Sequence, residues 1–214
     1  MILRLAESLD VPLRQRNALI LAAGFAPVFQ ERSLDDPALR PAREAIEALL
    51  SAHEPYPALA IDRHWNLIAS NRAVAALMVG AAPDLLKTPM NVLRLSLHPS
   101  GLAPRIANLP EWRDHLLFRL RRQFAETADP ALSDLLAELT AYPLGGARSS
   151  ARDLSAIAVP LQFRTERGVL SLLSTTMMFG TPLDPTLSEL ALETFLPADA
   201  ATAEALRQFA AKRE

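Results

Sequence analysis

The residues best suited to chemistry are an arginine and a histidine that lie four positions apart. Arg94 and His98 belong to the segment Asn91–Pro99, in which Leu93 and Leu97 mark an apolar face. If this segment is helical, the spacing brings the two basic side chains together, and a guanidinium binds a carboxylate through two parallel hydrogen bonds. The pair therefore predicts a place for the carboxylate of a ligand. The alternative is a solvated helix end, with both side chains near the carbonyl groups of the last turn.

Signals for catalysis and for metal binding are weak. The chain has four histidines and no cysteine, and it lacks His-Glu-x-x-His, glycine-rich phosphate-loop and Gly-x-Ser-x-Gly patterns. Asp134 and Glu138 share a helix face, which is typical of a solvated surface. The five arginines within Arg105–Arg122 also predict a solvated face more than a phosphate site. We therefore expect no metal, no cofactor and no enzymatic activity.

Apolar candidates for the wall of a pocket lie on one long helix and on two strands that the pattern predicts. They are Trp112 and Leu116 on a helix from about Pro110 to Glu126, Phe163 in the alternating run 157–164, and Leu172 and Met177 in the return strand Val169–Phe179. These side chains could line a tunnel for an acyl chain or fill an ordinary core. Spacing alone does not separate the two interpretations, because a pattern does not show volume.

The order of the predicted elements indicates an α+β fold. Two short helices over 1–25 precede a proline-rich linker and a helix over about 38–53, and Tyr56–Asn71 reads as strand, turn and strand. Asp10 and Asn71 are expected to cap the helices that follow them. Helical pieces then extend to 141, before strands over 157–164, 169–179 and 188–196 and a closing helix over 200–212. Five strands with helices in between predict a five-stranded antiparallel sheet with helices on one face.

Composition narrows the class of protein. The chain has 214 residues, 50% of them hydrophobic, and a net charge of −2. No apolar run approaches the ~20 residues of a membrane span, and the charged N-terminus does not read as a signal peptide. The acidic balance disfavours a stand-alone nucleic-acid binder. The strong preference for arginine over lysine is typical of a GC-rich bacterial genome, and we expect a cytoplasmic protein without a membrane partner.

Two stretches resemble known bacterial regulators. Residues 1–27 resemble the last two helices of the helix-turn-helix domain in regulators of the xenobiotic-response-element class. Residues from about 37 to 210 resemble the ligand-binding domain of MmyB-like transcription regulators, chiefly through Pro57–Asn71 (PALAIDRHWNLIASN) and Asn91–His115 (NVLRLSLHPSGLAPRIANLPEWRDH). The expected organisation is a helix-turn-helix remnant over 1–27, a linker and helix over 28–53, and a ligand-binding domain over 54–214.

The resemblance implies a PAS-like fold and a small-molecule sensor whose ligand is a fatty acid. It also implies that DNA is read only through a helix-turn-helix domain whose recognition helix this chain lacks. The acyl chain is expected between the sheet and the helices of residues 72–126, with its carboxylate at Arg94 or His98. Apolar stripes within residues 1–53 predict a homodimer. The alternatives are a dimerisation module without a small ligand and a small cytosolic enzyme.

Overall fold

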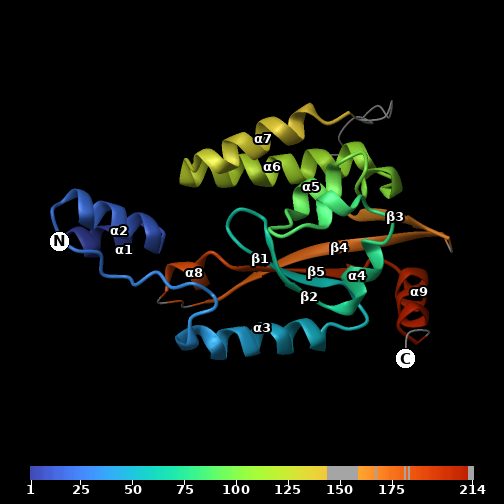
Figure 1. Ribbon diagram of the computed structural model, residues 1–214, viewed down its shortest axis with the longest axis horizontal. Helices are drawn as coiled ribbons and strands as arrows, with labels where there is room; N and C mark the ends of the chain where they lie inside the picture. The colour runs from blue at the N-terminus through green and yellow to red at the C-terminus, as the bar shows by residue number, and fades with distance from the viewer. Residues whose placement is uncertain (144–158, 167, 181, 183, 212–214) are drawn as a thin grey trace.

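A five-stranded antiparallel sheet forms the centre of the computed structural model, which describes residues 1–143, 159–166, 168–180, 182 and 184–211. The strands lie in the order β2-β1-β5-β4-β3 (Figure 1). Their bounds are β1 Ala58–Ile61, β2 Leu67–Ser70, β3 Leu161–Thr165, β4 Gly168–Met178 and β5 Ala191–Pro197. The predicted PAS-like α+β fold with five antiparallel strands is confirmed. Residues 157 and 158 of the predicted third strand lie outside the described residues.

Side-chain alternation gives the sheet two faces with different partners. On β1, Leu59 and Ile61 belong to the main core cluster, which includes the long helix α6. The small side chains of Ala58 and Ala60 belong to a second cluster on the opposite face. Strand β4 pairs without a break with β3 from Gly168 to Leu172 and with β5 from Leu172 to Met178, so the alternation holds along all of β4.

Helices cover both faces of the sheet, whereas the sequence predicted helices on one face. Figure 1 shows α5, α6 and α7 above the sheet and α3 below it. Ile46 and Leu50 of α3 pack against Ala58 and Ala60, because alanine leaves room for a helix to approach. The α-helices of the described residues are α1 Ile2–Ser8, α2 Leu13–Ala22, α3 Arg40–Ala52, α4 Arg72–Leu77, α5 Val92–Leu97, α6 Leu109–Thr127, α7 Pro130–Ala141, α8 Pro185–Ser188 and α9 Ala200–Ala211. Three short 3-10 turns are η1 Pro37–Leu39, η2 Pro83–Leu86 and η3 Ala103–Arg105.

Polar caps explain where several of these elements begin. The predicted cap Asn71 is confirmed, since its carboxamide oxygen accepts the N–H groups of Val74 and Ala58. The predicted cap Asp10 is wrong: it lies three residues before α2, with a positive φ of 50°, and Pro12 precedes the helix instead. The last strand begins later than predicted, because Asp184 caps the short helix α8 ahead of it.

The first two helices pack on each other and reach the rest of the molecule through polar contacts. The Arg14 guanidinium binds the Glu189 carboxylate just after α8, with nitrogen–oxygen distances of 2.8 and 2.9 Å. Arg14 also pairs with Glu31 in the segment that follows α2.

Among the described residues, no helix has the length and apolar character needed to cross a membrane.

Candidate functional site

A groove opens where α4 and α9 meet the hairpin end of β3 and β4. Its volume is about 1370 Å3, which is ample for a small molecule. Leu170 and Leu206 form its buried floor and belong to the main core cluster. The other apolar or small residues of the wall are Pro55, Ala73, Ala75, Ala76, Leu77, Val79, Thr165, Phe209 and Ala210. The groove is therefore an apolar recess that is continuous with the core.

Charged side chains surround this α4–α9 groove. They are Arg72, Arg105, Arg164, Arg207, Glu54 and Glu166. Arg72 pairs with Glu54 at 3.9 Å, and Arg207 pairs with Glu204 at 3.2 Å. The balance of the rim is positive, which suits a ligand with an apolar body and a negative group.

Arg105 is held in place on the rim by backbone and ring contacts. Its Nη1 donates to the carbonyl oxygens of Leu77 and Val79, at 3.1 and 2.7 Å. The guanidinium carbon lies 4.4 Å from the centre of the Phe163 ring, a cation–π distance. Burial lowers the pKa of Arg105, although an arginine remains charged in a protein.

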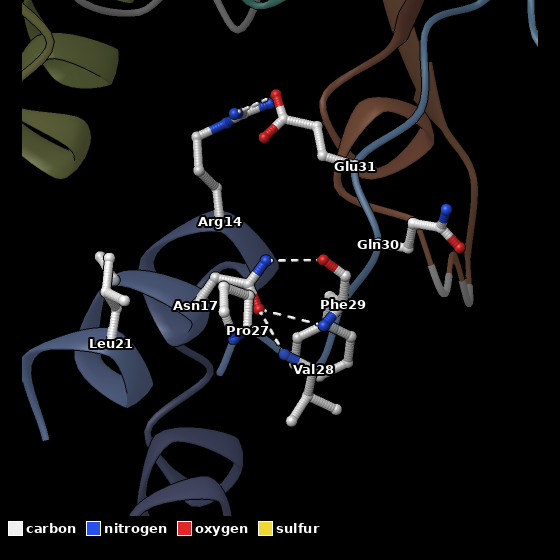
Figure 2. A pocket seen from close by; sticks show the side chains of 9 residues that line it. Arg14, Asn17, Leu21, Pro27, Val28, Phe29, Gln30 and Glu31 are labelled. Carbon is white, nitrogen blue, oxygen red and sulfur yellow. Dashed lines mark hydrogen bonds and ion pairs between the residues drawn. The ribbon is translucent and has the colours of Figure 1, made fainter. Parts of the chain in front are cut away.

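A second cavity, of about 470 Å3, lies between α2 and residues 27–31. Figure 2 shows the Asn17 side chain accepting the N–H groups of Val28 and Phe29 and donating to the Phe29 carbonyl. Arg14, on the same wall, is bound to Glu31 and Glu189. The polar groups of this cavity bind one another, so it offers a ligand fewer hydrogen-bonding partners than the α4–α9 groove does.

Arg94 and His98 do lie near each other, but the chain already supplies a carboxylate there. Arg94 Nε lies 2.9 Å from both Glu138 oxygens, and its Nη2 lies 2.8 Å from one of them. Tyr142 donates its hydroxyl hydrogen to the same carboxylate, and its ring is nearly perpendicular to the His98 ring, with 5.1 Å between the two ring centres. The hydrogen bond from Arg94 lowers the pKa of Glu138, although burial opposes the shift. A ligand carboxylate at Arg94 would have to displace Glu138.

Trp112, Leu116, Phe163 and Leu172 come together in the main core cluster between the sheet and α6. None of the four is more than 4% exposed. The Trp112 indole N–H donates to the Ser96 hydroxyl at 3.1 Å, and its ring stacks on His115. None of them lines either of the two cavities described above.

Met177 lies apart from the other predicted residues. It is 36% exposed and pairs with Leu192 of the α3-side cluster. Leu172 is five positions earlier on the same regular strand, and an odd spacing on a strand places two side chains on opposite faces. The structure therefore does not bring Met177 and Leu172 to one tunnel.

Sequence reasoning missed the residues of the α4–α9 groove. The sequence pattern predicts a solvated face for Arg105 and the four later arginines, yet Arg105 and Arg119 are both partly buried. Arg105 ends the short turn η3 and has no helical period with the others. The available signal was its position directly after Pro104, outside the helix that carries the other four.

No other chemistry is assembled in the described part of the chain. Its His, Asp and Glu side chains form no group of three or more that could hold a metal ion. The one histidine–carboxylate contact of note joins His64 and Asp129, at 2.9 Å. That contact links the β1–β2 turn to the start of α7, away from the groove.

Comparison with known families agrees with this architecture. The family model of the MmyB-like transcription regulator ligand binding domain matches residues 42–209. A comparison with curated proteins finds no match. The matched range includes most of α3, the whole sheet and nearly all of α9, and so it reaches every element that lines the α4–α9 groove. The chain belongs to the family of MmyB-like transcription regulator ligand-binding domains.

Proposed function

We propose that this chain is the ligand-sensing and dimerising domain of a bacterial transcription regulator in the cytoplasm, and that its ligand is a fatty acid or a similar amphiphile. The observation that carries the proposal is the α4–α9 groove, whose aliphatic wall reaches the buried floor formed by Leu170 and Leu206. A buried acyl chain contributes about 0.8 kcal/mol per methylene. A chain of about a dozen methylenes thus offsets the cost of association.

In this proposal the chain acts by binding and not by catalysis. Ligand entry would alter the contacts of α4 and α9 with the sheet and so change the shape that the domain presents to a partner. We assign DNA contact to a helix-turn-helix domain and not to these residues, because a net charge of −2 gives little attraction to phosphates.

Native mass spectrometry of the protein purified from cells tests the ligand. Co-purified lipid would add a mass that disappears on denaturation, and titration with dodecanoic acid would then show saturable binding. The variant Ala76→Trp fills the groove wall and is expected to abolish binding. Ala48→Trp is the matched control, because Ala48 is an exposed residue of α3 that does not line the groove. A protein that carries no lipid and does not bind dodecanoic acid contradicts the proposal.

The site predicted from the sequence is the competing location for the same ligand. It places the acyl chain among Trp112, Leu116, Phe163, Leu172 and Met177, with the carboxylate at Arg94 or His98. Binding there requires the packed core to open and Glu138 to leave Arg94. Loss of dodecanoic acid binding in Arg94→Gln, with full binding in Ala76→Trp, would favour that location over the groove.

A homodimer is the second part of the proposal. Several apolar side chains of the N-terminal segment are exposed, including Leu5, Leu21 and Phe25, and a second copy could cover them. Light scattering over a range of concentrations should give a dimer that the double substitution Leu21→Gln and Phe25→Gln converts to a monomer. A wild-type monomer at every concentration would contradict this part of the proposal.

One observation favours a second candidate function, a dimerisation module without a small ligand. The core beneath α6 is closely filled, since Trp112, Leu116, Phe163 and Leu172 are all buried. Such a domain would dimerise with equal strength before and after lipid removal. Lipid-dependent dimerisation would exclude it.

A further inference from the structure

We propose that Arg105, with Arg164 beside it, binds the anionic head group of the ligand and makes the α4–α9 groove selective for carboxylates over neutral amphiphiles. This inference rests on the proposed ligand-binding function. It concerns a residue that neither the family match nor the sequence pattern assigns.

Arg105 and Arg164 combine two properties: within the described residues they have no carboxylate partner, and they line the α4–α9 groove. Arg16, Arg43 and Arg113 also bind only carbonyl oxygens there, but they do not line the groove. Arg14, Arg94 and Arg119 are partly buried or half exposed, and each binds a carboxylate of the chain, from Glu189, Glu138 and Glu193 respectively. Within the described ranges, Arg105 has only carbonyl oxygens as hydrogen-bond acceptors. A charged group that loses water without gaining a counter-charge is costly to the fold. Such a group is a candidate for binding a charge supplied from outside.

The donors of Arg105 are divided in a way that suits this role. A guanidinium has five N–H donors in a flat fork. Both hydrogen bonds of Arg105 to the Leu77 and Val79 carbonyls come from Nη1. The Nη2 and Nε groups therefore keep N–H donors, to which the described residues supply no acceptor. An incoming carboxylate could accept from both in parallel.

The position of the guanidinium is set before a ligand arrives. It lies over the Phe163 ring, and Phe163 is itself fully buried in the core. Residue Ile106 pairs with Phe163 in an isolated antiparallel bridge, which ties the turn that carries Arg105 to strand β3. A head-group site fixed in this way loses little conformational freedom on binding.

Arg164 brings a second cation to the same segment. Its Nη1 donates to the Ile106 carbonyl at 3.1 Å, directly after Arg105 in the chain. Glu166 also lies on the rim, whereas Glu54 and Glu204 pair with Arg72 and Arg207. Among the residues that the structure describes, the rim cations without a carboxylate partner are thus Arg105 and Arg164, at the end of the groove formed by β3 and η3.

Isothermal titration with two probes of equal length tests the inference. Dodecanoic acid carries the charge, and dodecan-1-ol lacks it. In Arg105→Gln we expect roughly 10- to 100-fold weaker binding of the acid, the size of a lost charge-assisted pair, and alcohol binding within about threefold of wild type. Arg94→Gln is the matched control and is expected to change neither probe by more than about twofold, because Glu138 already compensates its charge.

The outcomes separate this inference from the function on which it rests. If wild-type protein binds neither probe, both the proposed function and the inference fail. If it binds both and Arg105→Gln weakens them equally or not at all, the inference alone fails. If Arg105→Gln is poorly folded, Arg105→Lys replaces it, because a single ammonium keeps the charge but loses the paired donors. In that case we expect Arg105→Lys to bind dodecanoic acid more weakly than wild type, by less than the roughly 10- to 100-fold expected for Arg105→Gln, and to bind dodecan-1-ol as wild type does. Equal affinity of Arg105→Lys and wild type for dodecanoic acid would contradict the inference.

Discussion

Two neighbouring regions of the same sheet differ in how completely their apolar side chains are covered. Beneath α6, Phe163 and Leu172 are enclosed by Trp112 and Leu116, and the four are among the most buried residues of the chain. At the hairpin end, Leu170 is just as well buried against the protein, yet it forms part of the floor of the α4–α9 groove.

The two regions also differ in whether their arginines have a carboxylate partner. Beneath α6, the Arg119 guanidinium lies against the buried Glu193 carboxylate, so the two charges of this pair compensate each other. On the rim of the groove, the hydrogen-bond acceptors that the described residues offer Arg105 are all carbonyl oxygens. We infer that the packed face provides stability and that the groove provides binding. Substitutions should therefore separate the two properties.

Truncation beneath α6 should give the largest effect. Leu172→Ala removes a fully buried side chain and should lower the free energy of unfolding by about 2–5 kcal/mol, since transfer and cavity costs add. Leu173→Ala is the matched control on the opposite face of the same strand, where the side chain is 36% exposed, and should cost less than about 1 kcal/mol. Urea denaturation followed by circular dichroism measures both. Equal losses would show that the α6 face is no more closely packed than the other.

The buried ion pair should give the next largest effect. Arg119→Ala leaves the Glu193 carboxylate buried with the Thr176 hydroxyl as its remaining side-chain partner. We expect a loss of about 3 kcal/mol, as is typical when one member of a buried pair is removed. The exposed pair of Arg122 with Glu126, on the same helix, should contribute less than about 0.5 kcal/mol in Arg122→Ala. Similar values for the two variants would contradict the distinction between an arginine with a buried partner and an arginine with an exposed partner on α6.

Local patterns predicted much of this fold. The strand–turn–strand at the start of the sheet and the long helix from 109 to 127 follow from alternation, proline placement and the cap Asn71. The packing of α3 on the opposite face could not be predicted in the same way. Its stripe of Ile46 and Leu50 shows that the helix is buried but not against which surface.

The candidate site was less predictable, because it depends on contacts between distant residues. Arg94 has the right chemistry for a carboxylate, but its partner Glu138 lies 44 positions away. The separation of Met177 from Leu172 could have been inferred, since five positions along a strand reverse the face. The role proposed for Arg105 depends on its having no acidic partner among the described residues, which no spacing encodes.

Mild acid should lower the free energy of unfolding by less than either Leu172→Ala or Arg119→Ala does. Burial lowers the pKa of His115, with the Arg119 charge acting in the same direction and Glu193 opposing it. The unfolded chain then takes up a proton near the ordinary histidine pKa of about 6.5, whereas the folded protein does so only at lower pH. Stability from this group is therefore complete above that pH and is lost as the pH falls toward the folded pKa.

Thermal unfolding at pH 7.5 and pH 5.5 measures this effect. His115→Gln should lose less stability between the two values than wild type does, because the titrating group is gone. His53→Gln is the control, because His53 ends α3 on the opposite side of the sheet from α6, and it should keep the wild-type difference. The rim arginines carry no group that titrates in this range, so dodecanoic acid binding by His115→Gln should match that of wild type. If His115→Gln left the pH dependence unchanged, α6 would tolerate a charged imidazole. Water would then reach the packed face beneath α6, contrary to the contrast drawn here with the groove.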